Sequence, residues 1–173
     1  SLDGFADDFR GRLHALAKVH AAVFHAAESA ISIDDIASLT FEPYRDVAQE
    51  RIAFSGPPIS LDRESGTTLA LCLHELTTNA IKYGALSKPE GRVALRWSVV
   101  DRAEPELALA WTESGGPLVN EPEKAGYGTR YVRAALSAIF GQPPIIAFEP
   151  DGLRCSAQGP LSRFLATDIP RAR

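Results

Sequence analysis

Residues 69–82 constrain the fold most, because their apolar side chains recur with the period of an α-helix. The apolar positions that would face a core are Leu69, Leu73, Leu76 and Ala80. Glu75, Asn79 and Lys82 follow one another at steps of four and three residues, so they share a different face. The segment therefore predicts a helix that is anchored along its back and presents an anion, an amide and a cation in a row.

This polar row permits two interpretations. Glu, Asn and Lys on an amphipathic helix usually form a solvated face, where a Glu–Lys pair adds ordinary helix stability. Alternatively, a carboxylate and an amide oxygen one turn apart can share a cation such as Mg²⁺, and a lysine one turn further can meet a phosphate. On this segment alone, the solvated face is the better interpretation.

Residues 107–119 predict a strand that ends in an acid and a pair of glycines. Apolar side chains alternate with small or polar ones over residues 107–111, and Glu113, Gly115 and Gly116 follow. A carboxylate at this point can accept a hydrogen bond from an exocyclic amine such as adenine N6, and adjacent glycines let a flat ring approach the backbone. A strand that runs into a β-turn explains the same residues, since Gly-Gly-Pro is a common turn signal.

A second glycine segment precedes a predicted helix. Gly126 and Gly128 come before Thr129, which is a good N-cap for the helix that the following apolar positions indicate. A glycine loop that opens into a helix N-terminus offers free N–H groups and a positive dipole end to phosphate. A lone Gly-x-Gly is weak evidence. The order of the three segments is more specific than any one of them.

In this order the segments resemble the ATP-binding domain that histidine kinases, DNA gyrase and MutL share. Within that superfamily the chain resembles the HWE group of sensor histidine kinases, named for a histidine in the first box and a Trp-x-Glu in the second. Here these residues are His74, Trp111 and Glu113. Three further stretches are similar to the same group, at residues 82–87, 91–97 and 126–130. The resemblance covers roughly residues 5–161.

The resemblance implies a role for each candidate residue. Asn79 would ligate Mg²⁺, with Glu75 beside it as a second ligand or as the group that polarises the attacking nucleophile. Glu113 stands where the superfamily has an aspartate that recognises adenine. The other implied ATP contacts are Lys82, for charge, Gly115 and Gly116 along the adenine slot, and Gly126, Gly128 and Thr129 near the phosphates. For His74, packing explains the residue at least as well as ligand binding, and for Trp111 the strand alternation favours a place in the core beside Leu107 and Leu109.

The implied fold is α+β, a two-layer α/β sandwich with a mixed sheet, known as the Bergerat-type ATP-binding fold. Residues 1–40 would carry the C-terminal helix of a dimerisation and phosphotransfer hairpin, with the helix over residues 3–28. Residues 41–173 would form the catalytic ATP-binding domain. Alternating apolar side chains predict strands, which we place at residues 51–54, 58–61, 92–100, 106–112, 145–148 and 153–157.

By this resemblance the chain would be the catalytic region of a cytoplasmic two-component sensor histidine kinase. Such an enzyme moves the γ-phosphate of ATP to a histidine, and a response-regulator aspartate then receives it. The protein supplies positioning and charge stabilisation for this transfer. The phosphoacceptor histidine should precede Phe5, and the chain has no Met, so we expect a fragment whose acceptor lies upstream. The implied partners are a response-regulator receiver domain, an upstream sensor domain and, through the hairpin, a second copy of the chain.

Composition agrees with this interpretation and leaves two others open. A formal net charge of -4 argues against a general affinity for nucleic acid or for an anionic membrane. Cys72 and Cys155 are not spaced as a metal site and should be buried, reduced thiols. One alternative is a phosphotransfer adaptor without ATP binding, which the complete set of candidate site residues opposes. The other is an anti-sigma-type serine kinase, which the long N-terminal helix and the Trp-x-Glu motif oppose.

Overall fold

The computed structural model describes residues 17, 21, 30–48, 50–118 and 126–165 of the 173-residue chain. The strands are Ala30–Ser32 (β1), Ile52–Ser55 (β2), Ser60–Asp62 (β3), Arg92–Val100 (β4), Glu106–Ser114 (β5), Ile145–Glu149 (β6) and Gly152–Pro160 (β7). The helices are Ile33–Phe41 (α2), Arg45–Ala48 (α3), Arg63–Lys82 (α4) and Tyr127–Phe140 (α5). Short 3-10 helices occupy Glu42–Tyr44 (η1), Ala85–Ser87 (η2) and Leu161–Arg163 (η3).

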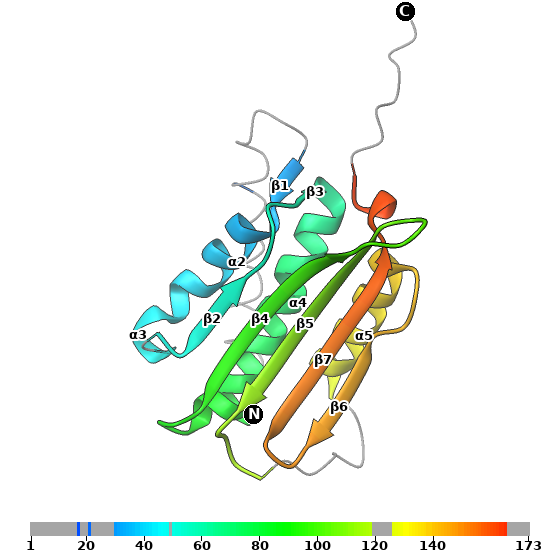
Figure 1. The fold of residues 1–173 in the computed structure, drawn as a ribbon. Helices are drawn as coiled ribbons and strands as arrows, with labels where there is room; N and C mark the ends of the chain where they lie inside the picture. Colours follow the sequence, from blue (N-terminus) through cyan, green and yellow to red (C-terminus); the bar gives the residue numbers. More distant parts are fainter. Residues whose placement is uncertain (1–16, 18–20, 22–29, 49, 119–125, 166–173) are drawn as a thin grey trace, which may run out of the picture.

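Five of the strands form one mixed sheet in the order β2-β4-β5-β7-β6. β2 runs parallel to β4, whereas the other neighbours are antiparallel. Figure 1 shows α4 and α5 behind this sheet, and no described element covers the opposite face. The arrangement confirms the predicted two-layer α/β sandwich. All six predicted strands are present, whereas β1, which pairs with β3, and α2 were not predicted.

The central strands β4 and β5 turn their large apolar side chains toward the helices. Val93, Leu95 and Trp97 alternate along β4, and all three are buried. The antiparallel register sets Leu95 opposite Trp111 and Val93 opposite Glu113. Glu113 therefore continues the buried row of β5, so its carboxylate enters the interior instead of solvent.

Helix α4 packs on the sheet through the face that the sequence predicts. The predicted apolar positions are all buried, namely Leu69, Leu73, Leu76 and Ala80. The Asp62 side chain caps the helix by accepting a hydrogen bond from the Ser65 N–H at 3.0 Å. Cys72 on α4 and Cys155 on β7 are buried free thiols, as predicted. The C-terminal turn of α4 lies at the same end of the sheet as the end of β5 and the start of α5 (Figure 1).

Helix α5 begins at Tyr127, so the predicted N-cap at Thr129 is wrong. Gly126 occupies the N-cap position with an extended backbone, and no side chain caps the helix. Gly128 lies inside the first turn, against the polar row of α4. A threonine N-cap contributes only about 1 kcal/mol, so packing of the first turn against α4 decides where the helix starts.

The segment before β2 shares one core with the sheet. Ile31 and Ile36 are buried in the cluster that includes the apolar face of α4. Residues 30–41 therefore pack against the same core as the sheet, and the predicted division into a hairpin and a catalytic domain stays a prediction. The predicted helix over residues 3–28 falls almost wholly outside the described residues, so the hairpin stays a prediction. None of the helices in the described part is long and apolar enough to cross a membrane.

Candidate functional site

A cavity of about 540 Å³ opens where α4 ends, β5 ends and α5 begins. Its volume is in the range of small-molecule binding sites. The residues that line it include Asn79, Gly84, Glu113, Gly126, Gly128 and Thr129. Five of these six were predicted as site residues from three separate sequence segments, and the fold brings them to one place. Gly84 is the addition.

Four predicted residues lie outside this lining, namely Glu75, Lys82, Gly115 and Gly116. Glu75 is buried beneath the site and Lys82 is exposed beyond it. The two glycines have a structural explanation of their own. Gly115 has a left-handed φ of +69°, and a Cβ on Gly116 would lie 2.6 Å from the Ala85 Cα. The segment after β5 therefore needs glycines to pass close to residues 85–90.

Glu113 is the most enclosed charged group of the site, with 1% of its surface exposed. Its Oε2 accepts a hydrogen bond from the Ala85 N–H at 2.8 Å, and its Oε1 accepts one from the Trp111 indole N–H at 3.1 Å. Burial raises the pKa of the Glu113 carboxyl, and these two donors partly oppose the rise. The Trp-x-Glu motif thus has a physical basis, because the buried tryptophan orients the acid two residues later.

Gly84 allows the turn after α4 to reach this acid. A Cβ at Gly84 would collide with the Glu113 Oε2. The Gly84 N–H donates to the Asn79 backbone C=O at 3.0 Å, which ties the turn to the last part of α4. The sequence analysis noted residues 82–87 but assigned no role to Gly84. The signal that could have identified it is a glycine just past the end of a helix that carries candidate site residues.

The polar row of α4 meets the first turn of α5. A Cβ added at Gly128 would lie 2.7 Å from the Glu75 Oε2 and 3.3 Å from the Asn79 Nδ2. Glu75 is 6% exposed, whereas Asn79 is half-buried and opens into the cavity. A carboxylate, an amide and a helix N-terminus therefore converge at this end, and Gly128 leaves the room that they need.

His74 belongs to a buried contact behind this row. Its Nδ1 lies 2.8 Å from the Tyr44 hydroxyl of η1, and the ring is 6% exposed. Burial and, secondarily, the charge of Glu75 raise the pKa of Tyr44 to about 12, so the phenol stays protonated. The geometry supports the packing and hydrogen-bonding interpretation of His74.

Oxygen donors at the Asn79 end suit a hard cation that is shared with a ligand. Within the described part of the chain, no group of three or more His, Cys, Asp or Glu side chains could hold a metal alone. The Asn79 amide oxygen and the Glu75 carboxylate are hard ligands of the type that Mg²⁺ takes, and Mg²⁺ commonly completes its shell with water and phosphate. The donor set and the cavity that Asn79 lines therefore fit Mg²⁺ bound together with a phosphate ligand.

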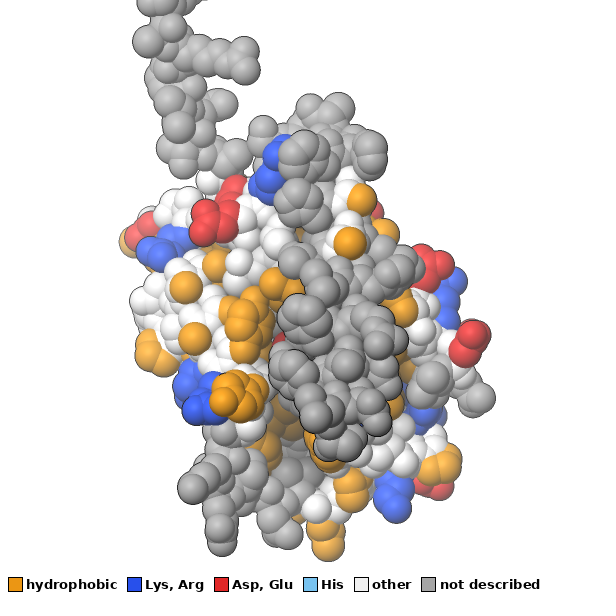
Figure 2. All heavy atoms as spheres, turned by 180° about the vertical axis from the view of Figure 1, so that it is seen from behind, with side chains coloured by type: hydrophobic (Ala, Val, Ile, Leu, Met, Phe, Trp, Pro, Cys, Tyr) orange, Lys and Arg blue, Asp and Glu red, His pale blue; other side chains and the backbone are white. Residues whose placement is uncertain are grey.

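The mouth of the cavity is apolar. Tyr83 and Leu118 belong to its lining and remain 74% and 84% exposed. Figure 2 shows the face of the molecule that carries the helices, where hydrophobic side chains gather in patches and charged ones lie mostly toward the rim. Exposed apolar groups beside a binding cavity offer contact area to the flat part of a ligand.

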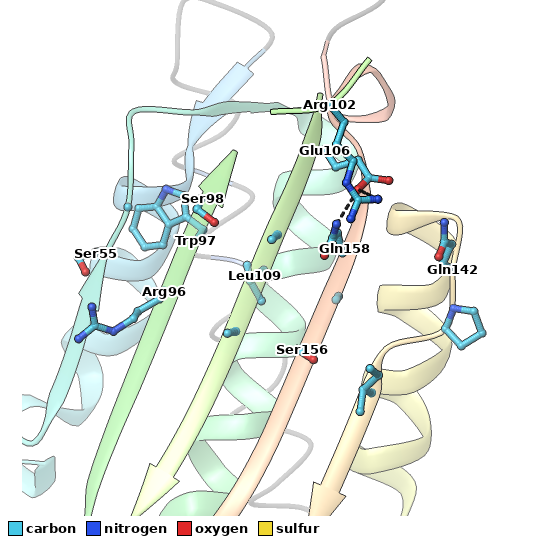
Figure 3. A pocket seen from close by; sticks show the side chains of 16 residues that line it. Ser55, Arg96, Trp97, Ser98, Arg102, Glu106, Leu109, Gln142, Ser156 and Gln158 are labelled. Atoms are coloured by element: carbon cyan, nitrogen blue, oxygen red, sulfur yellow. Dashed lines mark hydrogen bonds and ion pairs between the residues drawn. The ribbon is translucent and has the colours of Figure 1, made fainter. Parts of the chain in front are cut away.

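A larger hollow of about 710 Å³ lies on the open face of the sheet. Figure 3 shows Arg102, Glu106 and Gln158 linked at one end of it, and Arg96 beside Ser55 at the opposite side. None of the predicted site residues lines this hollow. Its floor is formed by a broad, shallow sheet surface, so the smaller cavity at the helix ends is the better candidate for the predicted chemistry.

Both the sequence relatives and the similar solved structures are histidine kinases. The sequence profile of the HWE histidine kinase family matches residues 1–58. Blue-light-activated histidine kinase 1 of Erythrobacter litoralis is 41% identical over 143 residues, which cover 79% of this chain and 39% of that protein. The chain thus spans about two fifths of that relative's length.

Solved structures show the same fold. The histidine kinase domain of the Erythrobacter litoralis EL346 blue-light activated histidine kinase matches with a TM-score of 0.66 at 16% identity, over 94% of this chain and 84% of that chain. The catalytic domain of histidine kinase ThkA matches with a TM-score of 0.56 at 14% identity, over 76% of this chain and 94% of that chain. The sheet and its helices therefore have the architecture of histidine kinase catalytic domains.

Proposed function

Because the chain belongs to the HWE histidine kinase family, we propose that it is the ATP-binding catalytic region of a sensor histidine kinase. In this role it moves the γ-phosphate of ATP to a histidine, for relay to a response-regulator aspartate. The observation that carries the proposal is the cavity at the helix ends. It has a buried carboxylate, Glu113, at one end and the start of α5 beside Asn79 at the other, which suits the base and the phosphates of one nucleotide.

Glu113 recognises the adenine base in this proposal. Each of its oxygens accepts one hydrogen bond from the protein, and a carboxylate has about four acceptor positions, so it can still receive the adenine N6 amine. Guanine presents a carbonyl oxygen instead of this amine, and an acceptor facing a carboxylate is unfavourable. Phe148 and Leu153 give the cavity apolar surface for the ring. The arrangement favours ATP over GTP.

The start of α5 and the polar row of α4 hold the phosphates. The first N–H groups of a helix point outward without intrahelical partners, and the helix dipole favours an anion there. Gly126, Gly128 and Thr129 occupy this position at the cavity. Asn79 and Glu75 would hold the Mg²⁺, which supplies charge neutralisation for the transferred phosphoryl group. Lys82, at the end of α4, adds positive charge near the same end.

Glu75 has a second proposed task, which is to polarise the attacking nucleophile. Its Oε2 faces Gly128, so a histidine that approaches the phosphates along the start of α5 comes near this carboxylate. A carboxylate that accepts the imidazole N–H makes the other ring nitrogen a better nucleophile. Glu75 thus orients the acceptor histidine, and Asn79 orients the donor.

The rest of the assembly is proposed from the same family membership. The C-terminal part of a dimerisation and phosphotransfer hairpin lies before β1, within the predicted residues 1–40, and the phosphoacceptor histidine lies upstream of it. A sensor domain precedes the kinase, a receiver domain of a response regulator takes the phosphoryl group, and the protein works in the cytoplasm. The serine-kinase alternative loses support, since the named relatives are histidine kinases. The oriented Glu113 counts against an adaptor without ATP binding.

Calorimetric titration with a non-hydrolysable ATP analogue, in the presence and absence of Mg²⁺, tests the proposal. We expect saturable binding that strengthens with Mg²⁺ and is stronger than binding of the corresponding GTP analogue. Arg96→Gln, on the open sheet face, is the matched control and should bind like the parent. A chain that is folded by circular dichroism but does not bind either analogue at millimolar concentration contradicts the proposal.

A further inference from the structure

Arg51 occupies a fixed position between α3 and β2. Its backbone N–H donates to the Ala48 C=O at 2.7 Å, and its C=O accepts from the Val93 N–H at 2.9 Å. Glu50, just before it, has a left-handed φ of +63°, which turns the chain sharply into the edge strand. The Arg51 side chain therefore leaves from a defined point on the sheet edge.

The guanidinium of Arg51 gathers backbone carbonyls from a segment far along the chain. Its Nη1 donates to the Lys88 C=O at 2.6 Å, with longer contacts to the C=O groups of Leu86 at 3.5 Å and Gly91 at 3.4 Å. Its Nε donates to the Ala48 C=O at 3.0 Å. A guanidinium is planar and always charged, so it can hold several carbonyl oxygens in one geometry. Arg51 thus links the sheet edge to residues 86–91.

This segment directly follows Ala85, whose N–H orients Glu113. The Lys88 N–H donates to the Ala85 C=O at 3.1 Å, and a Cβ on Gly91 would collide with the same carbonyl. Ala85 is 1% exposed, and its own N–H holds the Glu113 Oε2 at 2.8 Å. Residues 86–91 and Ala85 are therefore packed so closely that movement of one displaces the other.

We propose that Arg51 is a positioning residue for base recognition. By fixing residues 86–91 it sets the place of the Ala85 N–H, and through that donor it sets the direction of the Glu113 carboxylate. The inference rests on the proposed function, because the carboxylate is the group that distinguishes adenine from guanine. Arg51 itself does not line the cavity, so its effect reaches the ligand only through the turn after α4.

Nucleotide preference separates this role from simple stabilisation of a loop. The variants are Arg51→Gln, Arg51→Lys and, as the matched control, Arg96→Gln on the neighbouring strand β4. Each is titrated with non-hydrolysable ATP and GTP analogues, and its unfolding is followed separately. Arg51→Gln should lower the ATP preference about three- to tenfold, the range expected for one misplaced hydrogen bond. Arg51→Lys should lower it less, and Arg96→Gln should leave it unchanged.

A double variant tests whether Arg51 acts through Glu113. The double variant Arg51→Gln, Glu113→Gln should have the same preference for the ATP analogue over the GTP analogue as Glu113→Gln alone. The carboxylate that Arg51 would orient is already absent from both proteins. An unchanged preference in Arg51→Gln, even with lower stability, overturns the inference and leaves the proposed function intact. If Arg51→Gln does not fold, the preference of Arg51→Lys decides in the same way. A parent chain that binds neither nucleotide overturns both proposals.

Discussion

The two ends of the cavity are built in different ways. At the proposed base end, the Glu113 oxygens accept hydrogen bonds from Ala85 and Trp111, and the acid is almost completely enclosed. At the proposed phosphate end, Asn79 is only half-buried, and the polar row of α4 continues to an exposed Lys82. The protein thus fixes the base end in advance, whereas the phosphate end offers oxygen donors and a helix N-terminus that ligand and cation would complete.

Asn79→Ala should have the largest effect on nucleotide binding. The substitution removes a proposed Mg²⁺ ligand from the proposed phosphate end, which needs the cation to hold the phosphates. We expect Mg²⁺-dependent binding of an ATP analogue to fall by about a hundredfold or more, since even outer-shell partners of metal sites contribute 10–100-fold. Calorimetry measures the affinity, and circular dichroism checks the fold. Asn79→Asp keeps an oxygen donor and should retain Mg²⁺-dependent binding. If Asn79→Ala binds as tightly as the parent, the proposed division of labour between the two ends is wrong.

A methyl group at Gly84 should disturb the base end specifically. Its Cβ would collide with the Glu113 Oε2, so Gly84→Ala should weaken binding of the ATP analogue about tenfold and destabilise the fold by about 1–3 kcal/mol. Arg96→Gln is the control, because Arg96 lies on the open sheet face and does not line the cavity. Titration and urea denaturation of both variants provide the comparison. Equal effects of the two substitutions would show that Glu113 is not held as tightly as described.

The buried Glu113 should also leave a signature in the pH dependence of stability. Burial raises its pKa above the ordinary 4.5, so the folded chain holds the proton more tightly than the unfolded chain. The free energy of unfolding therefore falls as the pH rises from the unfolded pKa through the folded pKa. Glu113→Gln cannot titrate, so its stability should lack this contribution to the fall. Urea denaturation over a pH series measures both chains, and parallel curves would contradict the prediction.

Tyr44→Phe should have the smallest effect on nucleotide binding, since Tyr44 does not line the cavity. The substitution removes the hydroxyl that contacts the His74 Nδ1 and should lower the free energy of unfolding by about 1 kcal/mol. The preference for ATP over GTP should not change, because Glu113 is oriented by hydrogen bonds from Ala85 and Trp111. Urea denaturation and nucleotide titration measure the two quantities. A changed nucleotide preference would mean that Tyr44 also influences the orientation of Glu113, which would contradict the account.

The sequence predicted most of the fold because its signals are local. Alternating side chains placed β4 and β5 and indicated that Trp111 is buried, which its complete burial confirms. The helical period over residues 69–80 predicted the buried apolar face of α4, which the structure confirms. The start of α5 was placed wrongly at Thr129, because a local capping preference is weaker than packing against another helix.

The contacts that hold the base end were beyond sequence reasoning. Ala85 and Glu113 are 28 positions apart, and Arg51 and Lys88 are 37 apart. Ala85 acts through its backbone N–H, which carries no residue-type signal at all. Gly115 and Gly116 were assigned to the base slot from their position, whereas the structure accounts for them by their close approach to Glu90 and Ala85.

A crystal structure of the chain with a non-hydrolysable ATP analogue and Mg²⁺ tests most directly whether the two ends form one nucleotide site. We predict the adenine N6 within hydrogen-bonding distance of a Glu113 oxygen, the phosphates at the start of α5, and the cation on the Asn79 amide oxygen. A nucleotide bound elsewhere, for example in the hollow on the open sheet face, or a base that does not contact Glu113, would contradict this account.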